Sequence, residues 1–139
     1  MGLAFPKPAR GSSVLAREER QRKIEKAQNE VIAAAKTRDG HRCRWPEKHT
    51  CRGFLEGAHI TAKGMGGDPQ LIRTTRGNII CVCAWIHRRG PETLEHHELK
   101  VEPETTLGTD GRCSFWRQNA QGEYEMVARE RLIGLIERD

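Results

Sequence analysis

The sequence predicts a small α+β domain that begins with one long helix and ends with a hairpin followed by a second helix. Residues 12–36 contain no Gly or Pro and are rich in Ala, Glu, Lys, Arg and Gln, which favour a helix. Beyond residue 41 the apolar runs are short and separated by glycines, which is typical of strands and turns. A chain of 139 residues with a mean hydropathy of -0.73 can bury one modest core.

The first predicted element is the basic helix over residues 12–36, preceded by a disordered lead-in at residues 1–11. A narrow apolar stripe recurs at helical spacing, at Ile24, Ala27, Val31 and Ala34. Acidic residues precede basic ones by four positions in two pairs, Glu18–Arg22 and Glu19–Lys23. We expect Asp39-Gly40 to end this helix.

The later elements are predicted to be short. We expect strands within residues 54–60, 79–82 and 99–101, a short helix at 83–89, and a hairpin formed by residues 113–117 and 123–127. A terminal helix is predicted over Ala128–Arg138, because its apolar residues repeat at helical spacing.

The distribution of charge favours a polyanionic partner. Residues 1–52 contain 13 Lys and Arg against 6 Asp and Glu, whereas residues 53–139 contain 11 against 13. A basic half on a nearly neutral chain suits nucleic acid, and a solvated helix face is the alternative.

Membrane and secretory segments are not expected. No run approaches eighteen apolar residues, and the start of the chain lacks the apolar stretch of a secretory signal. We therefore expect an intracellular protein without a membrane partner. The five cysteines, an odd number, favour metal ligation or burial over a disulfide framework.

The most informative residues are two histidines and an asparagine between residues 57 and 87. His59 ends the first predicted strand, Asn78 begins the second, and His87 follows nine residues later on the short helix. Side chains in these places can converge on one point. A nitrogen base beside a divalent metal is what hydrolysis of a phosphodiester needs.

Residues 38–89 resemble an HNH endonuclease domain of the ββα-metal type, which is common in phage and bacterial nucleases. The matching features are the lead-in Arg38-Asp-Gly-His-Arg-Cys43, the motif Ala58-His59-Ile60, then Asn78, His87 and a glycine cluster at 64–67. The resemblance implies a small ββα-metal core at residues 38–92, with residues 1–37 as its basic helix. Residues 93–139 would form a hairpin and helix extension within the same globular domain.

The resemblance also implies roles for single residues. His59 would be the general base that activates water, Asn78 would hold its ring, and His87 would bind Mg²⁺ or a similar divalent cation. Many family members carry an acid or a second histidine directly before the base, where this chain has Ala58. Glu56 and Asp68 are the nearest substitutes as metal ligands.

Family members often hold a structural zinc between two cysteine pairs. Cys43, Cys51 and Cys83 match that pattern, although the seven residues between the first two exceed the usual spacing. Cys81 from the adjacent strand or His49 from the insertion could supply the fourth ligand. The alternative is that Cys81 and Cys83 are buried small hydrophobes without zinc, and Cys113 is expected in the core.

The sequence therefore predicts a metal-dependent endonuclease that acts on DNA. The alternatives are an inactive, zinc-stabilised module that binds nucleic acid, and a structural protein whose helix binds a partner protein; a homodimer stays open. The predicted DNA contacts are Arg17, Arg20, Arg22, Lys23, Lys26, Lys63 and Arg88.

Overall fold

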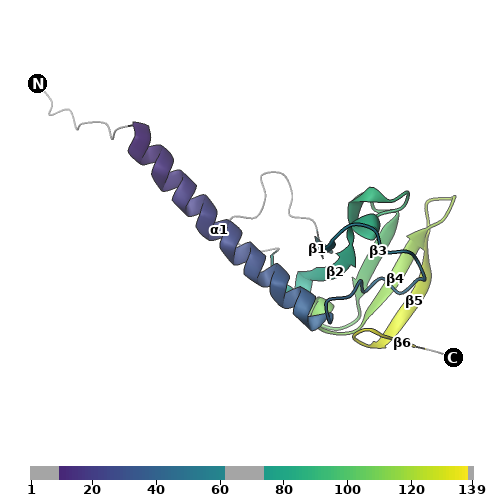
Figure 1. Cartoon of the computed structure of the whole chain (residues 1–139). Coiled ribbons are helices and arrows are strands. Elements are labelled where there is room, and N and C mark those ends of the chain that lie inside the picture. The colour runs from purple at the N-terminus through teal and green to yellow at the C-terminus, as the bar shows by residue number, and fades with distance from the viewer. Residues whose placement is uncertain (1–9, 62–73, 138–139) are drawn as a thin grey trace, which may run out of the picture.

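The computed structural model describes residues 10–61 and 74–137 of the chain. Its long helix, α1 (Arg10–Arg38), extends away from two antiparallel sheets, so that its amino-terminal half stands clear of them (Figure 1). The 29 residues of α1 give it a length of about 44 Å. The α+β class predicted from the sequence is confirmed, and the helix exceeds its predicted bounds by two residues at each end.

The first sheet is a hairpin of two strands, β1 (Leu55–His59) and β2 (Ile79–Cys83). Its register places His59 opposite Ile79 at one end and Leu55 opposite Cys83 at the other. A 3₁₀ turn, η1 (Arg76–Asn78), leads into β2, and a single π-helical turn, η2 (Trp85–Arg89), follows it. The predicted order of strand, strand and short helix is therefore present.

The second sheet has four antiparallel strands in the order β3–β4–β5–β6. Its elements are β3 (Leu99–Pro103), a 3₁₀ turn η3 (Gly108–Asp110), β4 (Cys113–Gln118), β5 (Tyr124–Leu132) and β6 (Leu135–Ile136). The predicted hairpin is confirmed in β4 and β5. Its turn is closed by the backbone N–H of Gly122, which donates to the carbonyl oxygen of Asn119 at 3.0 Å. Gly122 adopts a φ of 81°, which favours glycine.

The end of the chain is a strand pair, so the prediction of a helix over Ala128–Arg138 is wrong. β5 continues to Leu132, and a turn at Gly134 returns the chain as β6. Glu130 explains the difference, because its buried carboxylate accepts hydrogen bonds from the backbone N–H groups of Cys113 (2.9 Å) and Gly134 (2.7 Å). The apolar spacing of this segment suits either a helix or a strand pair, and it carries no sign of the buried acid.

Glu130 belongs to a buried ion cluster that joins distant parts of the chain. Arg44, whose side chain is 1% exposed, donates to both carboxylate oxygens of Glu130, at 2.7 and 3.0 Å. Arg44 also donates to Asp39, which in turn accepts from Arg38 at the end of α1. Burial disfavours the charge on both arginines, but the adjacent carboxylates outweigh it and raise the pKa of each.

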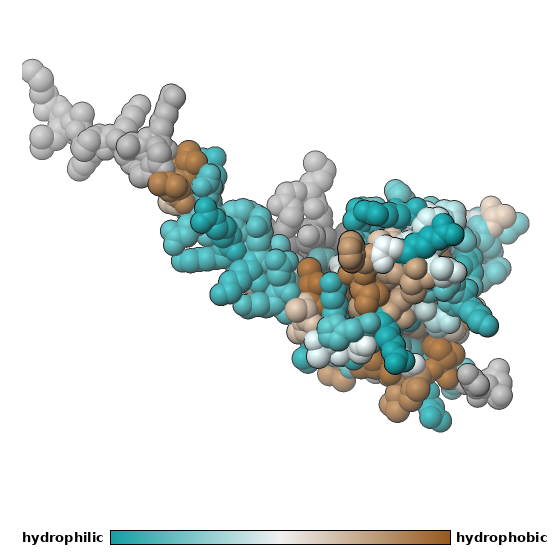
Figure 2. Space-filling view, viewed as in Figure 1, coloured by the Kyte–Doolittle hydropathy of each residue, from teal (hydrophilic) through white to brown (hydrophobic). Residues whose placement is uncertain are grey.

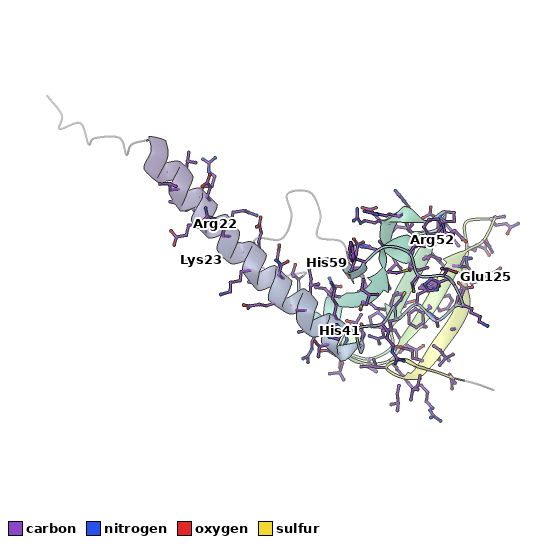
Figure 3. The ribbon with its side chains drawn as sticks, viewed as in Figure 1. Arg22, Lys23, His41, Arg52, His59 and Glu125 are labelled. Carbon is purple, nitrogen blue, oxygen red and sulfur yellow. The ribbon has the colours of Figure 1, made fainter. Side chains whose placement is uncertain are left out.

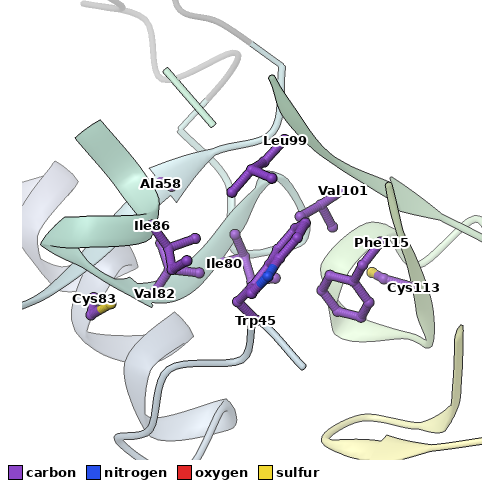
Figure 4. Close-up of a cluster of buried hydrophobic side chains, with 10 residues drawn as sticks. All are labelled: Trp45, Ala58, Ile80, Val82, Cys83, Ile86, Leu99, Val101, Cys113 and Phe115. Atoms are coloured by element: carbon purple, nitrogen blue, oxygen red, sulfur yellow. The ribbon is translucent and has the colours of Figure 1, made fainter. Parts of the chain in front are cut away.

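The hydrophobic core lies between the hairpin and the second sheet (Figure 4). Trp45 packs edge-on against Phe115, with ring centroids 5.5 Å apart. The buried core residues are Trp45, Ala58, Ile80, Val82, Cys83, Ile86, Leu99, Val101, Cys113 and Phe115. Cys113 is therefore a core residue, as predicted. Residues of the predicted core at 38–92 and residues of the predicted extension at 93–139 both contribute. The carboxyl-terminal strands are therefore packed into the same core as the hairpin.

The carboxyl-terminal part of α1 fixes the helix to the hairpin. Ala35 is fully buried, and Ile32 lies so close to Gly57 that an added Cβ would come within 2.8 Å of Ile32 Cγ2. The buried stripe runs through Ala35 and not through the predicted Ala34, which is exposed. Residues 13–23 are all exposed, and Figure 2 shows mainly hydrophilic side chains along this half of α1. Among the described helices, none is long and apolar enough to cross a membrane.

Candidate metal centre and active site

Four potential metal ligands meet where the chain before β1 approaches the end of β2. They are Cys43, His49, Cys51 and Cys83, and all four ligand atoms lie within 4.8 Å of one another. His49 Nε2 is 3.5 Å from the Sγ atoms of Cys43 and Cys83 and 3.3 Å from that of Cys51. The other ring nitrogen, Nδ1, lies 2.7 Å from the carbonyl oxygen of Glu47, which orients Nε2 toward the sulfurs.

This geometry suits a tetrahedral zinc ion. Zn–S bonds of about 2.3 Å and Zn–N bonds of about 2.0 Å place tetrahedral ligands about 3.5 Å apart for sulfur and nitrogen. The three sulfur–nitrogen separations match that value within about 0.2 Å. Three thiols and one imidazole are also a common ligand set for structural zinc. The cluster could therefore hold a metal ion such as Zn²⁺.

The acidities of the thiols fit the same interpretation. Burial raises the pKa of Cys43 to about 12. Burial also acts to raise the pKa of Cys83, but hydrogen bonds from the backbone of Ile86 and Arg52 and from His49 outweigh it and bring the pKa to about 7. Cys83 is thus the thiol that ionises most readily. The remaining thiols require the charge of a bound cation to become thiolate ligands.

The predicted inclusion of Cys81 in the zinc set is corrected by this geometry. Cys81 lies on β2 two residues before Cys83, outside the group of converging ligand atoms, and burial raises its pKa to about 11. Its backbone N–H donates to Asp39 Oδ2 at 3.0 Å. The fourth converging ligand atom comes from His49 instead. The signal in the sequence was the Cys-containing insertion itself, which places His49 two residues before Cys51.

The other end of the hairpin carries the predicted base and the asparagine. The side-chain amide of Asn78 makes two hydrogen bonds with the backbone of Thr61, accepting from its N–H at 2.9 Å and donating to its carbonyl oxygen at 3.0 Å. This pair closes the chain next to His59, which ends β1. The Nε2 atom of His59 lies 3.1 Å from the hydroxyl of Thr74. The Thr74 hydroxyl thus contacts the His59 ring, and the Asn78–Thr61 pair fixes the chain that follows β1.

His87 reaches the same region from η2, but its partner is Glu56. The Nδ1 atom of His87 lies 2.9 Å from Glu56 Oε1, and Arg88 contacts both carboxylate oxygens through Nε and Nη2. Arg88 first, and His87 after it, lower the pKa of Glu56 to about 2 against the effect of burial. In the neutral tautomer that donates from Nδ1 to this carboxylate, Nε2 is left as an acceptor.

Glu56 contacts His87 and Arg88, and its predicted role as a metal ligand stays a prediction. Arg88 is engaged with the same carboxylate, so its predicted contact with DNA would compete with this ion pair. Two further predicted residues, Asp68 and Lys63, and the glycine cluster at 64–67 lie outside the described residues.

His59 and His87 line one cavity of about 660 Å³. Ile32 of α1 and Gly57 of β1 form part of its wall, and the opposite wall comes from the carboxyl-terminal region. The lining residues of that region are Leu94, Glu95, His97, Leu99, Lys100, Val101 and Tyr124.

The basic residues predicted to contact DNA along α1 are exposed. They are Arg17, Arg20, Arg22, Lys23 and Lys26. The two predicted pairs are present, with Glu18–Arg22 at 3.8 Å and Glu19–Lys23 at 3.7 Å, and both are too exposed to hold the cations in place. Figure 3 shows Arg22 and Lys23 on the projecting half of the helix, well away from His59.

Comparison of the chain with protein-family models, with curated proteins and with solved structures finds no match.

Proposed function

We propose that the protein is a metal-dependent endonuclease that hydrolyses phosphodiester bonds in DNA, with His59 as the general base. The observation that carries the proposal is the cavity shared by His59 and His87, which come from different elements. The clamp between Asn78 and Thr61 supports it, because it fixes the chain beside His59. The spacing of these residues is similar to that of HNH nucleases.

The protein's own residues divide the work in the proposed mechanism. His59, half-buried and held through Thr74, would take the proton of the attacking water. His87, oriented by Glu56, would present Nε2 to the cavity, and Asn78 would keep the loop base closed. Each residue then acts from a position that a hydrogen bond fixes before substrate arrives.

The resemblance implies a divalent cation at this cavity, and the described residues provide a sparse ligand set for it. His87 offers one imidazole, whereas the described part of the chain assembles no group of three donors there. Mg²⁺ commonly completes its coordination with phosphate oxygens and water, which is compatible with few protein ligands. When bound, the cation would offset the charge that develops on the phosphate and the leaving oxygen.

We further propose that the ion in the Cys43–His49–Cys51–Cys83 cluster is a structural Zn²⁺. The four donors would fill all four positions of a tetrahedron, as in structural sites, and would leave none for water or substrate. Such an ion would fasten the chain before β1 to the end of β2, and so support the strand that carries His59.

A zinc-stabilised module that binds nucleic acid without hydrolysing it is the second candidate. Ala58 offers no ligand in front of His59, and Glu56 is occupied by its ion pair with Arg88, which together favour this candidate. Both candidates use the exposed basic face of α1 for contacts with phosphates, so binding alone does not separate them.

Incubation of supercoiled plasmid with the zinc-loaded protein separates the two candidates. An endonuclease converts the plasmid to nicked or linear forms when Mg²⁺ is added. It leaves the plasmid intact when Mg²⁺ is omitted. A protein that shifts the plasmid in a gel but never cuts it, across Mg²⁺, Mn²⁺ and Ca²⁺, would contradict the nuclease proposal and support the binding module.

A further inference from the structure

The carboxyl-terminal wall of the cavity is attached directly to the turn that carries His87. The backbone N–H of Leu94 donates to the carbonyl oxygen of Ile86, and that of Glu95 donates to the carbonyl oxygen of His87, both at 3.0 Å. Leu99 and Val101 then anchor β3 in the core. The side chains that β3 presents to the cavity therefore have a fixed position relative to His87.

Lys100 is the cation that this wall contributes. It lies between the core residues Leu99 and Val101 on β3 and lines the cavity together with His59 and His87. Its Nζ atom is 5.1 Å from the centre of the Tyr124 ring, within the range of a cation–π contact. Its acidic partner, Glu102, lies 3.6 Å away and is half-exposed, which makes a weak ion pair.

Tyr124 supports Lys100 from the neighbouring part of the sheet. Its hydroxyl donates to the carbonyl oxygen of His97 at 2.5 Å. His97 adopts a φ of 67°, a left-handed conformation that is uncommon for a residue with a side chain. The tyrosine thus ties β5 to the loop before β3 and keeps its ring under the Lys100 ammonium group.

The charges around the cavity favour an anion beside the histidines. Among the described residues that line it, Glu95 is the one carboxylate, whereas Lys100 contributes a cation and three imidazoles offer hydrogen bonds. An anionic ligand with several acceptor oxygens, such as a phosphodiester, fits this combination.

We propose that Lys100, supported by the ring of Tyr124, binds a backbone phosphate of the nucleic acid and positions the strand against His59. The carboxyl-terminal sheet is then part of the substrate site, and not only a structural addition to the hairpin. Lys100 acts here as a positioning residue. This inference rests on the proposed function for its ligand, a DNA strand, but not on cleavage itself.

The test compares Lys100→Gln with Arg112→Gln, which removes an exposed cation just before β4 on the same sheet. Binding of a fluorescein-labelled duplex oligonucleotide is measured by anisotropy in the zinc-loaded protein without Mg²⁺, at several salt concentrations. We expect Lys100→Gln to weaken binding on the order of tenfold at about 0.1 M salt and to flatten the log–log salt slope by about one unit. Lys100→Arg should restore both values, and Arg112→Gln should match the wild type.

With Mg²⁺ present, Lys100→Gln should raise KM for the same duplex and leave kcat within about twofold, as expected when uniform binding is removed. Equal affinity and slope in Lys100→Gln and Arg112→Gln would overturn the inference, as would a loss that Lys100→Arg fails to restore. If the wild type binds but never cleaves, the nuclease proposal fails while the binding comparison still decides the role of Lys100.

Discussion

The two ends of the β1–β2 hairpin carry groups of potential ligands that differ in one respect. At the Cys83 end, four donors from the chain before β1 and from β2 lie within 4.8 Å of one another. At the His59 end, the histidines are held by Thr74 and Glu56 and line a cavity of about 660 Å³. One end is closed by the protein itself, and the other leaves space for a ligand.

This difference separates a structural role from a chemical one. A site whose coordination positions are all protein ligands can stabilise the fold but cannot bind substrate, whereas catalytic sites keep a position open. Because both ends belong to one pair of strands, metal bound at the closed end would stabilise the strand that presents His59 at the open end. Variants at the two ends should therefore have separable effects.

The largest expected effect is loss of the metal from the cysteine end. Metal binding in small zinc units contributes folding free energy of roughly 10 kcal/mol or more. We expect Cys83→Ala to abolish zinc binding and unfold much of the domain, whereas Cys81→Ala should keep its zinc. The two cysteines are fully buried and lie two residues apart on β2, which makes them a matched pair. Zinc content and thermal melting of both variants check this, and equal zinc loss in both would contradict it.

The next effect tests whether the metal alone holds the cysteine end. Glu130→Ala would leave Arg44 buried without its main partner, and we expect a loss of about 3–5 kcal/mol in the free energy of unfolding. Because Arg44 directly follows Cys43, partial loss of zinc should accompany it. Urea unfolding measures the effect, with Glu125→Ala on the exposed part of β5 as control. A change below about 1 kcal/mol would show that the ion cluster is dispensable.

A smaller and local effect is expected from Glu56→Gln at the histidine end. Losing the carboxylate that orients a ligand histidine commonly costs 10–100-fold in metal affinity or activity, so cleavage should fall by about that factor with zinc content unchanged. Glu104→Gln is the control, because this carboxylate pairs with Arg129 and is not among the described residues that line the cavity. Unchanged cleavage by Glu56→Gln would show that Glu56 does not orient His87 for cleavage.

The pH dependence of this contact follows from the lowered pKa of Glu56. A depressed pKa means that the stabilisation is complete above the ordinary value of 4.5 and is lost as the pH falls toward about 2. Between pH 5 and 8 the carboxylate stays ionised, and any change in cleavage rate over that range must come from other groups. An NMR titration of the Glu56 carboxyl group measures this directly, and a midpoint at or above 4.5 would contradict the assignment.

The smallest effect per residue is expected on the projecting arm. Replacing Arg20, Arg22 and Lys23 by Gln should flatten the log–log salt slope of DNA binding by about three units if each contacts a phosphate. The same substitution at the exposed residues Arg112, Arg131 and Lys48 is the control. Equal slopes in the two triple variants would mean that the charges of the arm are only a solvated surface.

The sequence predicted those features that depend on local pattern. The helix, the hairpin strands and the β4–β5 turn follow from composition, alternation and turn residues near in the chain. The spacing of His59, Asn78 and His87 located residues that do come together around one loop and cavity. These features required no knowledge of the partners across the fold.

The features that the sequence did not predict depend on distant partners. The strand at residues 128–132 is fixed by Glu130, whose hydrogen-bond partners Arg44 and Cys113 lie far away in the chain. The choice of His49 over Cys81 depends on how the insertion before β1 folds back on β2. The role of Glu56 depends on Arg88 from a different element. In each case the local sequence pattern describes the segment but does not identify the distant residue that it contacts.

The most direct test of the separation between the two ends is the cleavage rate of His59→Ala at full zinc occupancy. The control is His41→Asn, because His41 is exposed and asparagine suits its positive φ of 53°. The account predicts one zinc per chain, unchanged melting and unchanged DNA binding in both variants, with Mg²⁺-dependent cleavage reduced on the order of 10²–10⁴ in His59→Ala alone. Wild-type cleavage by folded, zinc-loaded His59→Ala would contradict it.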